Sequence, residues 1–206
     1  MKTTTLVLSQ AILALALPQA APAPAPDADA ILPLGPKVPN TIVPGGKAPE
    51  TQELPSRFFP ESKRIKIRYG PYQLPSIDDV GLGTILSGEK GTLSTMAVNM
   101  KKPCDGKCGL LSAQASLEYT NGTEANVDTG SWLHHVVQAA TGEGKSDGVC
   151  GYPVERFFSS GNERTPTSFM DLMEKTIKSA YPVGPEDTFV AQIELMNMDS
   201  TPKEVY

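Results

Sequence analysis

The two histidines of the chain, His134 and His135, are neighbours in a strand-like run of residues. Neutral imidazole is the commonest transition-metal ligand in proteins, and it suits copper well. Successive side chains of a regular strand point to opposite faces, so both rings can reach one ion only at a strand end or at a bulge. The alternative is structural, with one ring packed against the core near Trp132 and the other in solvent.

The three cysteines, Cys104, Cys108 and Cys150, form a second candidate group. Cys104 and Cys108 are four residues apart across a turn-prone Asp-Gly-Lys loop, and Cys150 lies far downstream. We expect one disulfide, but spacing alone does not decide between the short loop and a bond to Cys150 that closes about 45 residues. A zinc site of three cysteines and one histidine fits the composition but not an oxidising compartment.

Residues 139–146 resemble a phosphate-binding loop, but the residues that follow argue against nucleotide binding. Such a loop needs a helix directly after Lys145, because the free N–H groups of that helix hold the phosphate. The sequence Asp-Gly-Val-Cys-Gly-Tyr-Pro follows instead, so we interpret this segment as a solvated loop. The chain also has no Gly-x-Ser-x-Gly motif.

The carboxylates give no support for a glycosidase. That chemistry needs two of them at a defined separation, and nothing in the sequence pairs them. They are scattered at Glu118, Asp128, Glu155, Glu163 and Glu194.

The elements that must position these side chains read as β-strands. Residues 63–69 alternate strictly, with Ile65, Ile67 and Tyr69 on one face, as in a half-buried strand. Further strands are expected at 111–119, ending at an Asn121-Gly122 turn, at 132–138 and at 188–196, with 95–100 as another candidate. Apolar residues at helical spacing predict a short helix over 169–177. This pattern favours a mainly β fold, an antiparallel, jelly-roll-like β-sandwich with one short helix.

The first 57 residues contain no aromatic side chain and differ in character from the rest. Residues 1–20 carry one Lys, an apolar stretch too short to span a bilayer and then small residues, which predicts a signal peptide and a secreted protein, extracellular or in a cell wall. Residues 21–62 are rich in Pro and Ala and are expected to form a disordered linker or pro-segment. The β-sandwich domain is expected at 63–206, with no membrane span.

Charge and surface features limit the partners. The net charge of −5 argues against nucleic acid as a partner. Asn121 begins an Asn-Gly-Thr sequence on the expected turn, where N-glycosylation would be tolerated. Glu155, Arg156, Glu163 and Arg164 flank a loop, and we interpret them as ion pairs that anchor it.

Several short motifs occur in order between Arg64 and Val205. They are Arg-Tyr-Gly-Pro-Tyr at 68–72, Lys-Pro-Cys at 102–104, Leu-Glu-Tyr at 117–119, Asn-Val-Asp-Thr-Gly at 126–130, Trp-Leu-His-His at 132–135 and Ser-Gly-Asn-Glu-Arg-Thr at 160–165. Together they resemble the stress up-regulated Nod (nodulin-nineteen-like) family of secreted plant and fungal proteins, which has no established activity. The Trp-Leu-His-His block is more distantly similar to the N-terminal domain of copper type II, ascorbate-dependent monooxygenases.

The second resemblance implies a β-sandwich in which His134 and His135 are two ligands of an electron-transfer copper. The third ligand in those enzymes is a histidine on a later strand, and the best-matching position here is Glu194. A carboxylate is a harder donor than imidazole and is poorer for copper(I). Those enzymes also activate oxygen at a second copper in a second domain, whereas this chain stops at Tyr206, so we expect a truncated form.

The sequence therefore predicts a secreted protein that holds one copper ion through His134 and His135, with Glu194 or water completing the site. We expect a metal-binding or structural extracellular module rather than a complete monooxygenase. Two alternatives remain: a copper-dependent oxidase or monooxygenase-like enzyme with a partner that supplies the second site, and a metal-free cell-wall binding module. The sequence does not identify the extracellular substrate or partner.

Overall fold

The computed structural model describes residues 48–171, 173 and 179–206. The signal peptide predicted at 1–20 and most of the linker predicted at 21–62 lie outside these residues. Within them the chain is mainly antiparallel β-structure with one short α-helix, as the sequence predicts. None of the helices in this part of the chain has the length and apolar character that a membrane crossing requires.

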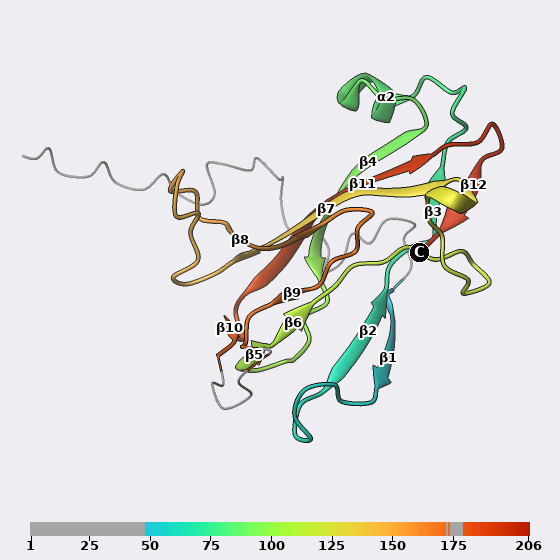
Figure 1. Cartoon of the computed structure of the whole chain (residues 1–206). Helices are drawn as coiled ribbons and strands as arrows, with labels where there is room; N and C mark the ends of the chain where they lie inside the picture. Colours follow the sequence, from blue (N-terminus) through green and yellow to red (C-terminus); the bar gives the residue numbers. More distant parts are fainter. Residues whose placement is uncertain (1–47, 172, 174–178) are drawn as a thin grey trace, which may run out of the picture.

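A four-stranded antiparallel sheet with the strand order β4-β11-β7-β8 forms the centre of the molecule (Figure 1). Its strands are β4 (Thr92–Met100), β7 (Ser131–Thr141), β8 (Glu155–Ser160) and β11 (Thr188–Asn197), and a 3-10 helix, η1 (Val127–Thr129), leads into β7. Phe189, Ala191, Ile193 and Leu195 of β11 are buried, because alternate residues of a strand share one face. The strands expected at 95–100, 132–138 and 188–196 are thus confirmed.

Two-stranded antiparallel ladders complete the fold of the described residues (Figure 1). They pair β1 (Glu50–Leu54) with β2 (Arg64–Arg68), β3 (Tyr72–Leu74) with β12 (Lys203–Val205), β5 (Cys108–Leu110) with β10 (Tyr181–Val183), and β6 (Ser112–Ala113) with β9 (Thr167–Ser168). Tyr72, Leu74, Val183 and Val205 of these ladders join the buried cluster of the central sheet. The core therefore lies between the sheet and the short ladders.

Regular structure begins before the domain boundary expected at residue 63. Strand β2 confirms the strand expected at 63–69, and its partner β1 lies inside the range assigned to the linker. An antiparallel partner satisfies the backbone N–H and C=O groups of one edge of β2. Among the described strands, β1 and β2 pair only with each other.

The strand expected at 111–119 is interrupted. Only β6 is a regular strand there, and Glu118 and Tyr119 make isolated bridges. The turn predicted after it is present, because Gly122 has a φ of 83° and donates its N–H to the carbonyl of Tyr119 at 2.9 Å. Asn121 is exposed on this turn, and its glycosylation stays a prediction.

The α-helix of the described chain, α2 (Leu82–Ser87), is not where the apolar pattern predicts one. The helix expected at 169–177 falls largely on residues outside the described part, and Phe169 and Met170 lie in a bend. Met170 is buried, so the apolar side chain there reflects core packing. Helix α2 ends at Gly88, whose φ of 78° lets its N–H bond to the carbonyl of Thr84, and Glu89 follows directly.

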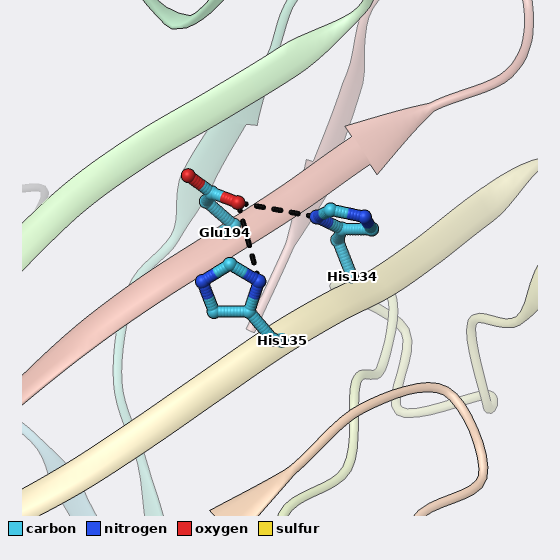
Figure 2. Close-up of side chains that lie close together, drawn as sticks. All are labelled: His134, His135 and Glu194. Atoms are coloured by element: carbon cyan, nitrogen blue, oxygen red, sulfur yellow. Dashed lines mark hydrogen bonds and ion pairs between the residues drawn. The ribbon is translucent and has the colours of Figure 1, made fainter. Parts of the chain in front are cut away.

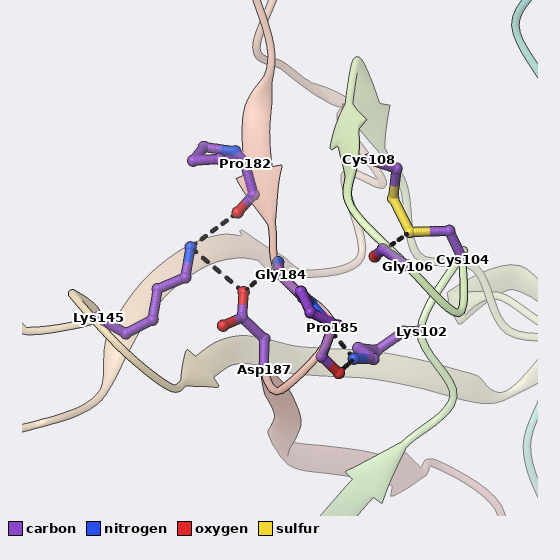
Figure 3. Close-up of a disulfide and its surroundings, with 9 residues drawn as sticks. All are labelled: Lys102, Cys104, Gly106, Cys108, Lys145, Pro182, Gly184, Pro185 and Asp187. Carbon is purple, nitrogen blue, oxygen red and sulfur yellow. Dashed lines mark hydrogen bonds and ion pairs between the residues drawn. A yellow bond between two sulfur atoms is a disulfide. The ribbon is translucent and has the colours of Figure 1, made fainter.

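Cys104 and Cys108 form a disulfide (Figure 3). Of the pairings that the spacing left open, the structure thus has the short loop, and Cys150 is a free, exposed thiol. In the loop-entropy model a bridge over so few residues constrains the unfolded chain less than a bond to Cys150 would. The bond also removes two of the thiolate ligands that the zinc alternative needs.

The segment 139–146, which we expected to be a solvated loop, contains the end of β7 up to Thr141 and then a turn, and Lys145 is buried. Its Nζ donates to the carbonyl of Pro182 at 2.7 Å and lies 3.6 Å from Oδ2 of Asp187 (Figure 3). The chain can fold back in this way because Gly142 has a φ of 149° and an added Cβ would lie 2.3 Å from Oδ1 of Asp187. Residues 148–150 then form a turn rather than a helix, as the sequence predicts.

Candidate metal centre

A β-bulge in β7 brings His134 and His135 to the same face of the central sheet. In the antiparallel pairing of β7 with β11, His135 lies opposite Glu194. The next pair is Leu133 with Leu195, so His134 is the extra residue at a shift in register. An extra residue in one strand bends it and re-aims a side chain. Two adjacent rings needed a bulge or a strand end to meet, and the structure has the bulge.

Both imidazole rings point at one carboxylate (Figure 2). The Nδ1 atom of His134 lies 3.1 Å from Oε2 of Glu194, and the Nδ1 atom of His135 lies 3.2 Å from the same oxygen. The two ring centroids are 5.2 Å apart. The three residues that the sequence proposes as ligands therefore come together from two neighbouring strands.

Two further polar side chains contact this cluster. Ser94 of β4 lies opposite Glu194 in the sheet, and its Oγ donates to Oε1 of Glu194 at 3.2 Å. Glu89, between α2 and β4, places its Oε2 3.4 Å from Nε2 of His134. Sequence reasoning identified neither residue. No local pattern marks them, because only the pairing of β4 with β11 and the turn after α2 bring them to the site.

The centre is shielded but accessible from solvent. The exposed fraction of the side chain is 26% for His134, 36% for His135 and 11% for Glu194. The ring of His134 makes an edge contact with Trp132, with 5.2 Å between the ring centroids. The alternative to metal binding had one histidine ring packed near Trp132. This contact is present, but the ring of His134 still points at Glu194. An ion could reach the three donor atoms without unfolding of the sheet.

The donor set suits a divalent transition metal, because imidazole nitrogen and carboxylate oxygen are both common ligands of such ions. The three ligand atoms lie within 4.8 Å of one another. Metal–nitrogen bonds of about 2 Å require two ligating nitrogens to lie no more than about 4 Å apart. Small side-chain rotations would therefore bring these donors to coordinating distances.

No lysine or arginine of the described residues pairs with this cluster. Within the described residues, the only basic side-chain nitrogens within 4.0 Å of the carboxylates of Glu89 and Glu194 belong to His134 and His135. Glu194 is a buried residue, and a buried carboxylate is unfavourable unless it is paired or coordinates a metal. A bound divalent ion would supply the missing positive charge.

Glu155, Arg156, Glu163 and Arg164, which were predicted to form ion pairs that anchor a loop, do not pair with one another. Arg156 pairs with Asp147 at 3.1 Å, and Arg164 pairs with Glu124. Glu163 accepts a hydrogen bond from a backbone N–H of its own loop instead. That bond is the main reason why the pKa of Glu163 is lowered. These residues hold loops together and lie outside the histidine cluster.

Glu118 is likewise structural. Lys66 donates to its Oε2 at 2.7 Å, and Arg68 pairs with its other oxygen. Burial raises the pKa of Glu118, but the hydrogen bond and charge of Lys66, together with Arg68, outweigh this and lower it overall. The carboxylate is therefore committed to an ion pair.

Two fungal proteins are similar to this chain in sequence. The probable copper-dependent oxygenase M1 of Phoma sp. is 32% identical over 153 residues, which is 73% of this chain and 36% of that protein. The probable copper-dependent oxygenase clz3 of Cochliobolus lunatus is 43% identical over 86 residues, which is 41% of this chain and 26% of that protein. The chain is a relative of these two proteins. It spans well under half the length of either, and neither a family model nor a solved structure matches it.

Proposed function

We propose that the chain binds one copper ion through His134, His135 and Glu194. The observation that carries this proposal is the β-bulge in β7, because it turns two successive histidines toward one carboxylate. The names of the two relatives, both probable copper-dependent oxygenases, favour copper over other metals. Two histidines and a carboxylate also bind iron(II) in other proteins, but a given nitrogen and oxygen site binds copper(II) more tightly than iron(II).

Each residue of the cluster has a role in this proposal. His134 and His135 present Nδ1 as ligand atoms, and Glu194 supplies Oε2 and part of the balancing charge. Ser94 holds the other oxygen of Glu194. Glu89 faces Nε2 of His134, and an acceptor there would hold the proton on Nε2 and leave Nδ1 free to ligate. When bound, copper supplies one-electron chemistry by cycling between its two oxidation states.

We further infer that this copper module serves oxidation by a protein of the oxygenase type. The support is the relatives' names and the resemblance of the Trp-Leu-His-His block to copper monooxygenases. Because the chain corresponds to only part of each relative, we assign it the metal-binding step and not a complete reaction. Secretion and membership in the nodulin-like family belong to the same proposal and rest on residues 1–20 and on the motifs between Arg64 and Val205.

The direct test is a copper(II) titration of the full chain after metal has been removed by chelation. We expect one ion per chain by calorimetry and a nitrogen-ligated copper(II) spectrum by electron paramagnetic resonance. The double variant His134→Ala, His135→Ala should weaken copper binding by more than roughly 10–100-fold. That range is typical for loss of a residue that only hydrogen-bonds a metal ligand. Gln192→Ala is the matched control, because Gln192 is exposed on the same strand as Glu194.

Two results would contradict copper binding at this site. One is a double variant that binds copper(II) as tightly as the unchanged chain. The other is displacement of copper by an equal concentration of zinc(II) or iron(II). Addition of ascorbate without oxygen separates the two parts of the proposal. A copper that serves oxidation should be reduced to copper(I) and lose its electron paramagnetic resonance signal, whereas a copper that is only held in place should keep it.

A further inference from the structure

A cavity of about 640 Å³ lies between the β1–β2 ladder and the core face of the central sheet. Apart from Gln138, the sheet side of this cavity is apolar and buried, with Met100 from β4, Leu133 and Val136 from β7, and Ile193 and Leu195 from β11. Its volume falls within the range of about 300–1,000 Å³ that is typical of small-molecule sites. The cavity is thus large enough for a ligand and has the lining that an apolar ligand requires.

Strand β2 lines the other side of the cavity. Ile65 and Ile67 face it and are only partly buried. The β1–β2 ladder extends away from the central sheet (Figure 1), and neither strand pairs with any other strand of the described chain. Apolar side chains that line a space of this size are open to water, and a ligand with an apolar body would release that water.

The entrance to the cavity is positively charged. Arg57, Lys63 and Arg64 are exposed residues of its lining, and within the described part of the chain none of them lies within 4.0 Å of a carboxylate oxygen. This cationic group stands out because the chain as a whole has a net charge of −5. A cleft lined by one sign of charge with low-dielectric walls concentrates ions of the opposite sign.

We propose that this cavity binds one organic anion with an apolar body, of the class of long-chain carboxylates. The apolar body lies against Val136, Ile193 and the isoleucines of β2, and the carboxylate lies at the entrance with Lys63 and Arg64. Guanidinium groups bind carboxylates through paired hydrogen bonds, which suits Arg64 to this role.

This site is separate from the metal centre. Leu133 and Ile193 line the cavity, whereas their neighbours His134 and Glu194 meet on the other face of the same sheet. Binding of the anion therefore does not rest on the copper proposal. The double variant His134→Ala, His135→Ala should bind the anion with unchanged affinity, so that failure of one proposal leaves the other testable.

The experiment compares two ligands that share a chain and differ in charge. The full chain is loaded with 11-(dansylamino)undecanoate, a fluorescent carboxylate, which is displaced by dodecanoate or by dodecyltrimethylammonium below their micelle concentrations. We expect dodecanoate to bind at least about tenfold more tightly. Lys63→Glu should remove most of that preference, whereas Lys90→Glu, at an exposed lysine that does not line the cavity, should keep it.

A variant that fills the cavity tests its location. Ala115→Trp places a large side chain in the lining and should abolish binding of the fluorescent carboxylate, provided that its circular dichroism matches that of the unchanged chain. The proposal is overturned if dodecanoate displaces nothing, if both ligands bind equally, or if Lys90→Glu acts like Lys63→Glu. Self-association that Ala115→Trp abolishes would assign the cavity to a second copy of the chain and would also overturn it.

Discussion

Two charged clusters lie toward opposite ends of the β7–β11 pair, and they are completed in different ways. At one end Lys145, just after β7, is enclosed by Asp187, just before β11, and by Glu155 at 3.4 Å. The ring of Tyr181 lies 4.1 Å from its Nζ. Toward the other end, His134 and His135 meet Glu194, and no lysine or arginine of the described residues pairs with that carboxylate. The first cluster contains its own cation, whereas the second has ligands and negative charge without one.

This difference separates a structural cluster from a binding site. A buried lysine with a carbonyl, carboxylates and an aromatic face around it has little left to bind, and loss of one member of such a cluster destabilises the fold. A cluster of imidazole rings and carboxylates offers ligands for a metal ion, and that ion must come from solution. The β7–β11 pair therefore carries one cluster that supports folding and one that we expect to act in binding.

Removal of the built-in cation should have the largest effect. Lys145→Met removes the cation that lies between Asp187 and Glu155, and the side chains of Lys145 and Asp187 are only 7% and 6% exposed. Breaking a buried ion pair from one side costs about 3–5 kcal/mol. We expect the free energy of unfolding in urea to fall by about 3 kcal/mol.

The control for this variant is Lys107→Met, which makes the same change at an exposed lysine. We expect its unfolding free energy to stay within about 0.5 kcal/mol of the unchanged chain. A similarly small loss in Lys145→Met would mean that the enclosed lysine does not stabilise the fold. It would contradict the assignment of the lysine cluster to folding and of the histidine cluster to binding.

Addition of the missing cation should have the next largest effect. Copper(II) at one hundred times its dissociation constant should raise the unfolding free energy of the metal-free chain by about 2.7 kcal/mol, because it binds the folded state. Glu194→Gln keeps the size of the side chain but removes its charge, so the gain should largely disappear. Urea unfolding with and without copper measures both.

The Lys145→Met variant serves as the control for this experiment. It should keep the whole gain from copper, since its altered cluster lies toward the other end of the strand pair. If Glu194→Gln gains as much as the unchanged chain, the copper acts elsewhere.

The periodicity of the sequence was sufficient to predict the strands that carry both clusters. Ala191, Ile193 and Leu195 alternate with polar or less buried neighbours, and the burial of a β-strand follows that alternation. The pair His134-His135 also stood out, because adjacent histidines are rare and chemically distinctive. A mainly β fold with a histidine pair on a strand was therefore within reach of the sequence alone.

The remaining features depend on contacts between distant segments. A bulge is a mismatch between two strands, so the sequence of β7 alone does not reveal that His134 is the extra residue. Glu89 reaches the site through the turn at Gly88, and Ser94 reaches it through sheet pairing. The burial of Lys145 likewise depends on contacts with Pro182 and Asp187, which lie about 40 residues downstream. A local sequence pattern cannot predict such contacts.

A smaller effect is expected from Glu89, which we consider a positioning residue. Glu89→Gln removes the charge that faces Nε2 of His134 and should weaken copper binding by about tenfold, the lower end of what outer partners contribute. Glu186→Gln is the control, because it removes one exposed charge on the side of the enclosed lysine. Equal losses of copper affinity in the two variants would mean that only the net charge of the chain matters. Glu89 would then have no positioning role at the metal centre.

The smallest effect should come from Tyr181 in the cluster that contains its own cation. Its hydroxyl donates to Oε2 of Glu155 at 2.8 Å. Burial, and then this bond and the charges of Glu155 and Asp187, raise the pKa of Tyr181. A pKa that is raised on folding means that the contribution to stability is complete below the unfolded value of about 10 and is lost as the pH rises above it.

Tyr181→Phe tests this pH dependence. At neutral pH the unchanged chain should be more stable than Tyr181→Phe by about 1 kcal/mol, the typical net value of one hydrogen bond. That difference should shrink as the pH rises from 9 to 11, because the unfolded phenol then ionises while the folded one resists. The other tyrosines are common to both proteins and cancel in the comparison. A difference that stays constant up to pH 11 would show that the phenol is not held in its neutral form, and the enclosed cluster would then be less closed than its contacts indicate.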